Sequence, residues 1–170
     1  MLSIGSPSAY AQPDADAGPA PLPPEQLAQL RKQDELFSIA FAKIVSLMIR
    51  AASHNHLSLA DLTTRILPAM QLGQFAILDG EVPGVPLPVP VACALWASVS
   101  PEIDQRMSNA EHQVYRLLPD DWRSGDVLWL TDVIGDKTSI PLLLQRLNTD
   151  VFEQRPVKIP LRANPVEFKA

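Results

Sequence analysis

The sequence predicts a mixed α/β sheet covered by helices. Apolar residues recur every three or four positions over residues 25–52, as they do in a helix. Residues 127–134 form a strongly apolar run rich in β-branched side chains, as in a buried central strand. Helical and strand-like segments follow one another along the chain, which favours a sheet with helices packed on it. The apolar fraction of 46% and the charged fraction of 19% are those of a globular protein.

The first 24 residues differ in composition from the rest of the chain. They contain six of the 17 prolines, five alanines and no Lys or Arg. Such a segment buries too little apolar surface to offset its ordering entropy. We therefore expect a flexible Pro/Ala-rich tail over residues 1–24 and a single folded domain over residues 25–170. Residues 9–11 (Ala-Tyr-Ala) resemble a signal-peptidase site but lack the basic and apolar segments of a leader, so we expect a cytoplasmic protein.

The first helix is indicated by its start and by its apolar pattern. Pro24 and Glu25 suit a first helical turn, and the pattern continues to about Ala52. Between Leu36 and Ile49 apolar residues lie nearly all the way round, which predicts burial in the core or against a second chain. A homodimer through this helix is therefore one expectation.

Cap and turn signals place the remaining elements. Ser58 and Asp61 form a capping-box pattern that opens a second helix to Ile66 or beyond, and Pro68 is expected to bend or shorten it. Residues 80–90 carry four prolines and predict a rigid, extended loop, and residues 120–126 form a turn-rich connector. The other expected elements are helices over 100–110 and 139–147, and strands over 74–79, 91–99, 127–134 and 157–161.

Charge and residue counts exclude several classes of function. A net charge of −5 argues against a nucleic-acid partner held by attraction to phosphate. One cysteine, Cys93, excludes an internal disulfide and a cysteine-rich zinc site. No Gly-rich phosphate loop or nucleophile elbow occurs, and no run approaches the ~18–20 apolar residues that span a bilayer. We expect no metal, no nucleotide cofactor and no stable membrane insertion.

Two residues are candidates for chemistry. His54 follows the expected end of the first helix, where a solvated histidine next to the helix dipole is the ordinary alternative. A metal site with His56 would lack a third nearby ligand, and His112 is most simply a surface residue. Asp132 interrupts the apolar strand over 127–134, and it either faces a cleft, has a buried partner or caps a turn, because an unpaired buried charge is costly.

Several motifs occur in the order found in one known family. His54 is followed by Leu-Pro-Ala-x-Gln at 67–71, then Gln-Phe-Ala-Ile-Leu at 74–78 and Pro-Val-Ala-x-x-x-Trp-Ala at 90–97. Asp-Trp-x-Ser-Gly-Asp at 121–126 leads into Trp129 and Asp132, and Glu-Phe stands at 167–168. In these blocks the chain resembles the RTX toxin-activating lysine acyltransferases over roughly residues 50–170.

The resemblance implies a GNAT-like fold and a specific reaction. Members of this family take a fatty acyl chain from acyl-acyl carrier protein and attach it to internal lysines of an RTX protoxin. Their catalytic His and Asp fall here on His54 and Asp132, and the family tends to dimerise. Acyl carrier protein and a protoxin are thus the implied partners, with acyl-acyl carrier protein as co-substrate and no cofactor. The acyl chain needs an apolar groove, which Trp96 or Trp129 could line.

Two other functions remain open on the sequence alone. The same fold could bind a partner without catalysis, as a chaperone-like companion of a secreted toxin. A GNAT-type enzyme using acyl-CoA is a third reading, against which the missing Gly-rich pyrophosphate-binding turn counts.

Overall fold

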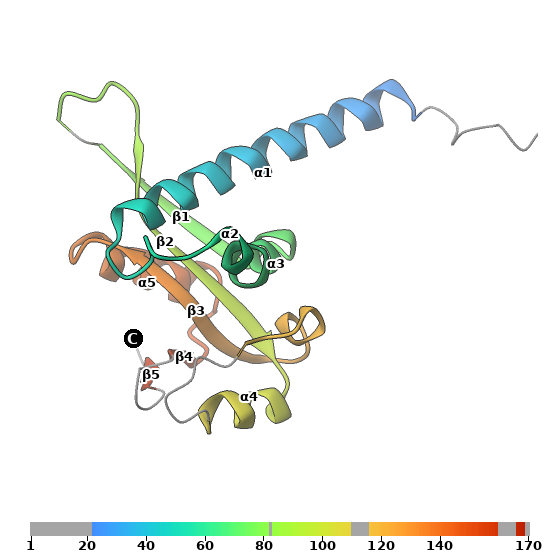
Figure 1. Ribbon diagram of the computed structural model, residues 1–170, viewed down its shortest axis with the longest axis vertical. Coiled ribbons are helices and arrows are strands. Elements are labelled where there is room, and N and C mark those ends of the chain that lie inside the picture. Colours follow the sequence, from blue (N-terminus) through green and yellow to red (C-terminus); the bar gives the residue numbers. More distant parts are fainter. Residues whose placement is uncertain (1–21, 82, 110–115, 160–165, 169–170) are drawn as a thin grey trace, which may run out of the picture. The chain divides into compact units, whose positions relative to one another are not determined.

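The computed structural model describes residues 22–81, 83–109, 116–159 and 166–168. The chain divides into two compact units, residues 1–34 and 35–170, and the second unit contains the whole sheet (Figure 1). The expected tail over 1–24 lies almost entirely outside the described residues. No helix within the described part of the chain is both long and apolar enough to span a bilayer.

Within the described residues, the second unit contains one mixed sheet of five strands, in the order β1-β2-β3-β4-β5. The strands are β1 (Phe75–Gly80), β2 (Val89–Val99), β3 (Val127–Gly135), β4 (Val157–Ile159) and β5 (Val166–Phe168). Only the β3–β4 pair is parallel, and α5 (Ser139–Asp150) makes the crossover that a parallel pair needs. The predicted mixed sheet and its central strand β3 are confirmed. The three-residue strand β5 is an addition to the predicted set.

The helices begin where the cap signals predict. α1 spans Pro24–Arg50, and α4 spans Pro101–Ser108 with Ser100 as its N-cap. The second predicted helix is present in three parts, α2 (Leu59–Asp61), η1 (Leu62–Ile66) and α3 (Leu67–Gln71). Its capping box is confirmed, since Asp61 N–H donates to Ser58 Oγ at 3.2 Å and Ser58 N–H donates to Asp61 Oδ2 at 2.9 Å.

The middle part of this helix, η1, is a π-helical turn that ends just before Pro68. Leu67 N–H donates to the carbonyl of Leu62, five residues back, where an α-helix would use the residue four back. A proline inside a helix lacks the N–H for its own bond, and its ring crowds the carbonyl four residues earlier. The widened turn accommodates both effects. Pro68 therefore interrupts the α-helical pattern without ending the helix.

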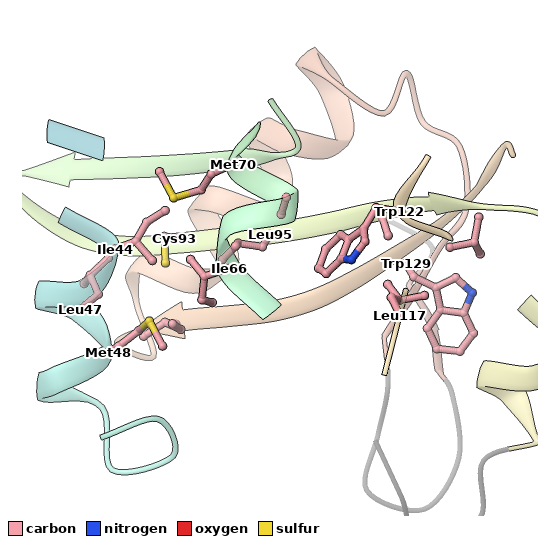
Figure 2. Packing of buried hydrophobic residues seen from close by; sticks show 14 of the residues in the cluster. Ile44, Leu47, Met48, Ile66, Met70, Cys93, Leu95, Leu117, Trp122 and Trp129 are labelled. Atoms are coloured by element: carbon pink, nitrogen blue, oxygen red, sulfur yellow. The ribbon is translucent and has the colours of Figure 1, made fainter. Parts of the chain in front are cut away.

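Each face of the sheet has its own apolar core. On one face, residues 35–50 of α1 and the η1–α3 segment pack on alternate residues of β1, β2 and β3, with Ile44, Ile66 and Leu95 fully buried (Figure 2). On the other face, α5 packs through Leu143 and Leu147. Alternation along β2 follows from the pleat of a strand, which sends successive side chains to opposite faces.

The predicted burial of the Leu36–Ile49 run is correct for one side of α1. Phe37, Phe41 and Ile44 contribute to the core, whereas Leu36 and Ile39 remain exposed. A helix packed on one sheet face buries one stripe of its surface, and the other stripe stays in water.

The Asp-Trp-x-Ser-Gly-Asp segment at 121–126 fastens the end of β2 to the start of β3. Ser124 Oγ donates to the carbonyl of Asp121 and accepts from Ser100 N–H, each at 2.9 Å. Trp122 is buried in the core on the face that carries α1. Gly125 N–H donates to the carbonyl of Ser98 at 3.1 Å. This motif thus fixes the connection on which the position of β3 depends.

Gly125 has no room for a side chain. A Cβ there would lie 2.6 Å from Ser100 Cα and 2.7 Å from the carbonyl oxygen of Val99, both backbone atoms. We predict that Gly125→Ala lowers the free energy of unfolding by about 2 kcal/mol, the usual cost of forcing extra volume into a packed site. Urea unfolding followed by tryptophan fluorescence measures this change. Unaltered stability would show that the two segments are not in such close contact.

Candidate active site

His54 lies in the turn that follows α1. Its N–H donates to the carbonyl of Ala51 at 2.9 Å, and its own carbonyl accepts from Leu57 N–H at 3.0 Å. These bonds close a tight turn, which returns the chain toward the sheet before α2 begins. The His54 side chain is only 11% exposed, so it is not the solvated helix-end histidine considered above.

Asp132 reaches the same face of the sheet because β3 contains one extra residue. Along β2, Leu95 pairs with Asp132 but the next residue, Trp96, pairs with Leu130, so Thr131 has no partner. Such a bulge shifts the alternation of side chains by one position. Without it, Asp132 would share a face with Leu130, in the core under α5. With it, Asp132 lies beside Leu95 on the face that carries α1 and η1.

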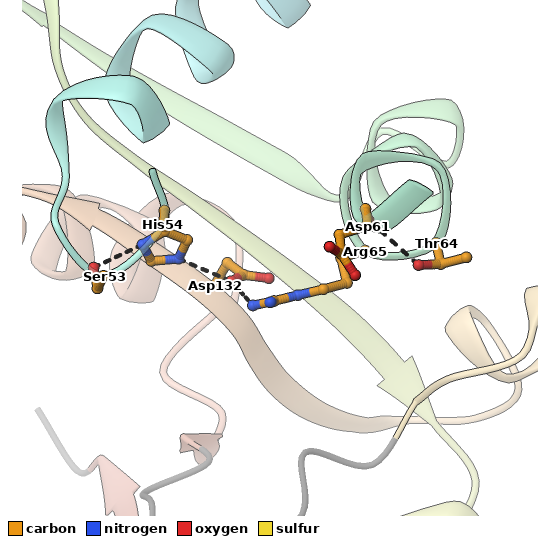
Figure 3. Close-up of polar contacts among 6 residues, drawn as sticks. All are labelled: Ser53, His54, Asp61, Thr64, Arg65 and Asp132. Carbon is orange, nitrogen blue, oxygen red and sulfur yellow. Dashed lines mark hydrogen bonds and ion pairs between the residues drawn. The ribbon is translucent and has the colours of Figure 1, made fainter. Parts of the chain in front are cut away.

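His54 and Asp132 form a hydrogen-bonded pair in this position (Figure 3). His54 Nε2 is 3.0 Å from Asp132 Oδ1, and the aspartate side chain is 3% exposed. On the other edge of the ring, Ser53 Oγ lies 2.8 Å from His54 Nδ1. An ionised carboxylate only accepts hydrogen bonds, so a neutral His54 carries its proton on Nε2 and accepts from Ser53 at Nδ1.

Arg65 is the third partner in this group. Its Nη2 donates to Asp132 Oδ1 at 2.6 Å, so one carboxylate oxygen accepts from both Arg65 and His54. Arg65 projects from the π-helical turn η1, and its side chain is 31% exposed. Burial of a carboxylate is costly without an opposite charge, and Arg65 supplies that charge. π-Helical turns are often found at functional sites, which fits this location.

Cys93 lies on β2, on the same face of the sheet as Leu95, and is completely buried. Burial raises the pKa of its thiol to about 12, and the negative charge of Asp132 contributes to the rise. The thiol is therefore protonated at neutral pH. A thiolate nucleophile or metal ligand at this position is not available. Among the described residues, no three His, Cys, Asp or Glu side chains gather as metal ligands would.

Comparison with known proteins identifies the family. A model of the RTX toxin acyltransferase family matches residues 33–167, most of the chain. The chain belongs to this family. The match contains every described member of the site, Ser53, His54, Arg65 and Asp132, and it also contains the motif at 121–126 that holds β2 and β3 together.

Two curated relatives carry names of this kind. The chain is 37% identical over 84 residues to the leukotoxin-activating lysine-acyltransferase LtxC of Aggregatibacter actinomycetemcomitans, an alignment covering 48% of this chain and 44% of that protein. It is 32% identical over 82 residues to the lysine-acyltransferase RtxC of Vibrio cholerae, covering 48% of each. The chain thus spans about half the length of the curated relatives it matches.

The structure brings together the two residues singled out in the sequence and adds two more. The sequence pattern gives Ser53 and Arg65 no role in the site, because a serine in a turn and an arginine on a helix are usually solvated. Of the other candidates, His56 is exposed, and His112 lies outside the described residues.

The two tryptophans considered for an acyl groove lie on opposite faces of the sheet. Trp96 packs edge-on against Phe152 on the α5 face, with ring centroids 5.3 Å apart. Trp129 belongs to the core on the other face and donates from Nε1 to Asp104 Oδ1 at 2.7 Å. Only Trp129 shares the face that carries His54.

The buried thiol gives a prediction for alkaline pH. A thiol ionises near pH 9 in the unfolded chain and only near pH 12 in the fold. The folded state therefore holds a proton that the unfolded state loses, so stability falls as pH rises from 9 to 12. We predict a smaller fall for Cys93→Ala, because other groups titrate equally in both proteins. Urea unfolding at a series of pH values measures it. If stability falls equally with pH in the unaltered chain and in Cys93→Ala, the result contradicts the burial of the Cys93 thiol.

Proposed function

We propose that the protein is a protein-lysine acyltransferase that moves a fatty acyl chain from acyl-acyl carrier protein to internal lysines of an RTX protoxin. The observation that carries this proposal is the His54–Asp132 pair, held at 3.0 Å inside the region that matches the family. The printed names of the two relatives, both lysine-acyltransferases, support the same reaction.

The pair suits the chemistry of amide formation from a thioester. A lysine side chain has a pKa near 10.4 and is almost wholly protonated at neutral pH, so it is not a nucleophile until a proton is removed. The ammonium first loses one proton to solvent. His54 then accepts a second proton from the neutral amine as its nitrogen bonds to the thioester carbonyl carbon. The carbon–sulfur bond then breaks, and the thiolate of the carrier leaves with a proton from the imidazolium. Asp132 holds the ring and stabilises its charged form, as the carboxylate of a Ser-His-Asp triad does.

The hydrogen bonds of His54 indicate which nitrogen acts. Nε2 is engaged by the buried Asp132, so Nδ1 is the nitrogen that receives the proton. In the structure Ser53 Oγ lies at that nitrogen, 2.8 Å away, and the serine is exposed. We assign the place of this hydroxyl to the incoming lysine amine, which can make the same hydrogen bond.

Acyl carrier protein and the protoxin are the partners, no metal or nucleotide takes part, and the reaction takes place in the cytoplasm without stable membrane insertion. A homodimer would use the exposed stripe of α1 that contains Leu36 and Ile39. The protoxin is the class of protein with Gly- and Asp-rich nonapeptide repeats.

Mass spectrometry of the co-expressed protoxin tests the proposal. The chain, its His54→Ala variant and its His56→Ala variant are each produced with the candidate protoxin in cells that supply acyl carrier protein. We predict a fatty-acyl mass on a protoxin lysine with the intact chain and with His56→Ala. With His54→Ala the modified fraction falls at least about a hundredfold, since a general base contributes 10²–10⁴ in rate.

His56 is the matched control because it is a second histidine in the same turn and is exposed. Full modification by a folded His54→Ala variant would refute the catalytic assignment. Absence of any acyl mass with the intact chain, together with stable co-purification of the two proteins, would favour the non-catalytic, chaperone-like function instead.

A further inference from the structure

Arg65 is the charged member of the site that the proposed reaction leaves without a role. It shares one oxygen of Asp132 with His54, at 2.6 Å from Arg65 Nη2 and 3.0 Å from His54 Nε2. The carboxylate side chain is only 3% exposed, so solvent screens this group weakly. A change of charge on Arg65 would therefore act directly on the imidazole.

The helix that carries Arg65 is shaped to direct it at Asp132. Arg65 lies in the π-helical turn η1, which precedes Pro68 and changes the direction of side chains relative to an α-helix. Asp61 lies four residues before Arg65. Hydrogen bonds from Ser58 lower the pKa of the Asp61 carboxyl, and the charges of Arg116 and Arg65 lower it to a smaller extent. Figure 3 shows the Arg65 side chain extending from this helix to the buried carboxylate of Asp132.

We propose that Arg65 is a positioning residue that compensates the charge of Asp132 and thereby favours the form of His54 that can accept a proton. With His54 neutral, the ionised Asp132 and Arg65 balance each other. When His54 takes a proton, the group gains a net positive charge beside Arg65, so the proton passes on to the leaving thiolate more readily than it would without Arg65. This inference rests on the proposed function for its catalytic part, but not for its electrostatic part.

Among the described residues, the carboxylate of Asp132 on β3 links His54 to other charged and titratable groups. Asp132 accepts from His54 and from Arg65 of η1, and its charge contributes to the raised pKa of Cys93 on β2. The raised pKa of the Cys93 thiol keeps it neutral across the pH range in which histidine titrates. Asp132 and Arg65 are therefore the described charges joined to the ring through this one carboxylate oxygen. Removal of Arg65 leaves Asp132 alone to stabilise the imidazolium.

NMR titration of the His54 ring in the full chain tests the electrostatic part without any need for activity. We predict that Arg65→Gln raises the midpoint of the His54 titration by about one pH unit, the order expected when one of two flanking charges is lost. Arg65→Lys keeps the charge and shifts the midpoint by less than half as much. Arg116→Gln is the matched control. It removes an equal charge bound to Thr64 on the same turn, and leaves the midpoint unchanged.

The pH dependence of acylation tests the catalytic part. For Arg65→Gln, the acid limb of kcat/KM moves to higher pH by the same amount, so activity falls by up to about tenfold on that limb and recovers in alkali. In Arg65→Lys, most of the lost activity is restored. A merely structural role would lower activity at every pH and leave the limb where it is.

An unchanged or lowered His54 midpoint in a folded Arg65→Gln protein overturns the inference about Arg65. Arg65→Met is a second charge-removing variant, and failure of both to fold would assign Arg65 to stability alone and also overturn it. Absence of acylation by the intact chain refutes the proposed function, whereas the titration result still decides the electrostatic role.

Discussion

The single extra residue in β3 is the constraint on which the site depends. Strand geometry places alternate side chains on opposite faces, so a regular β3 would carry Asp132 into the core under α5. The bulge at Thr131 reverses the alternation for the rest of the strand. It turns Asp132 toward the turn after α1 and toward η1, where His54 and Arg65 lie. Bulges commonly redirect a side chain, and this one brings Asp132 to the candidate site.

The site joins three segments that are far apart in sequence, and each is fixed by a local device. Tight backbone bonds at Ala51 and Leu57 hold the His54 turn, and a proline-associated π turn directs Arg65. The strand that carries Asp132 is fastened at its start by the 121–126 segment, which has Gly125 against backbone atoms of Val99 and Ser100. The segment at 121–126 therefore stabilises the fold, and through the fold it fixes the position of Asp132.

Much of the fold could be read from the sequence, because caps and periodicity are local signals. The capping box at Ser58 and the apolar strand β3 are examples, and Asp132 was conspicuous as a charge inside that strand. The bulge was not predictable, since Leu128, Leu130 and Ile134 fit a regular alternation. Arg65 was missed for a related reason. An arginine on a helix has the sequence pattern of a solvated residue, and only the tertiary fold brings it to a buried carboxylate.

The most direct test of the central claim is the turnover of Asp132→Asn, measured with purified acyl donor and protoxin alongside the binding of the donor. Asp104→Asn is the control, because Asp104 is a second partly buried carboxylate, paired with Lys158 and Trp129. If Asp132 orients the His54 ring and stabilises its charged form, turnover of Asp132→Asn falls at least about a hundredfold, while donor affinity stays within about threefold. Turnover equal to that of the Asp104→Asn protein would contradict the account.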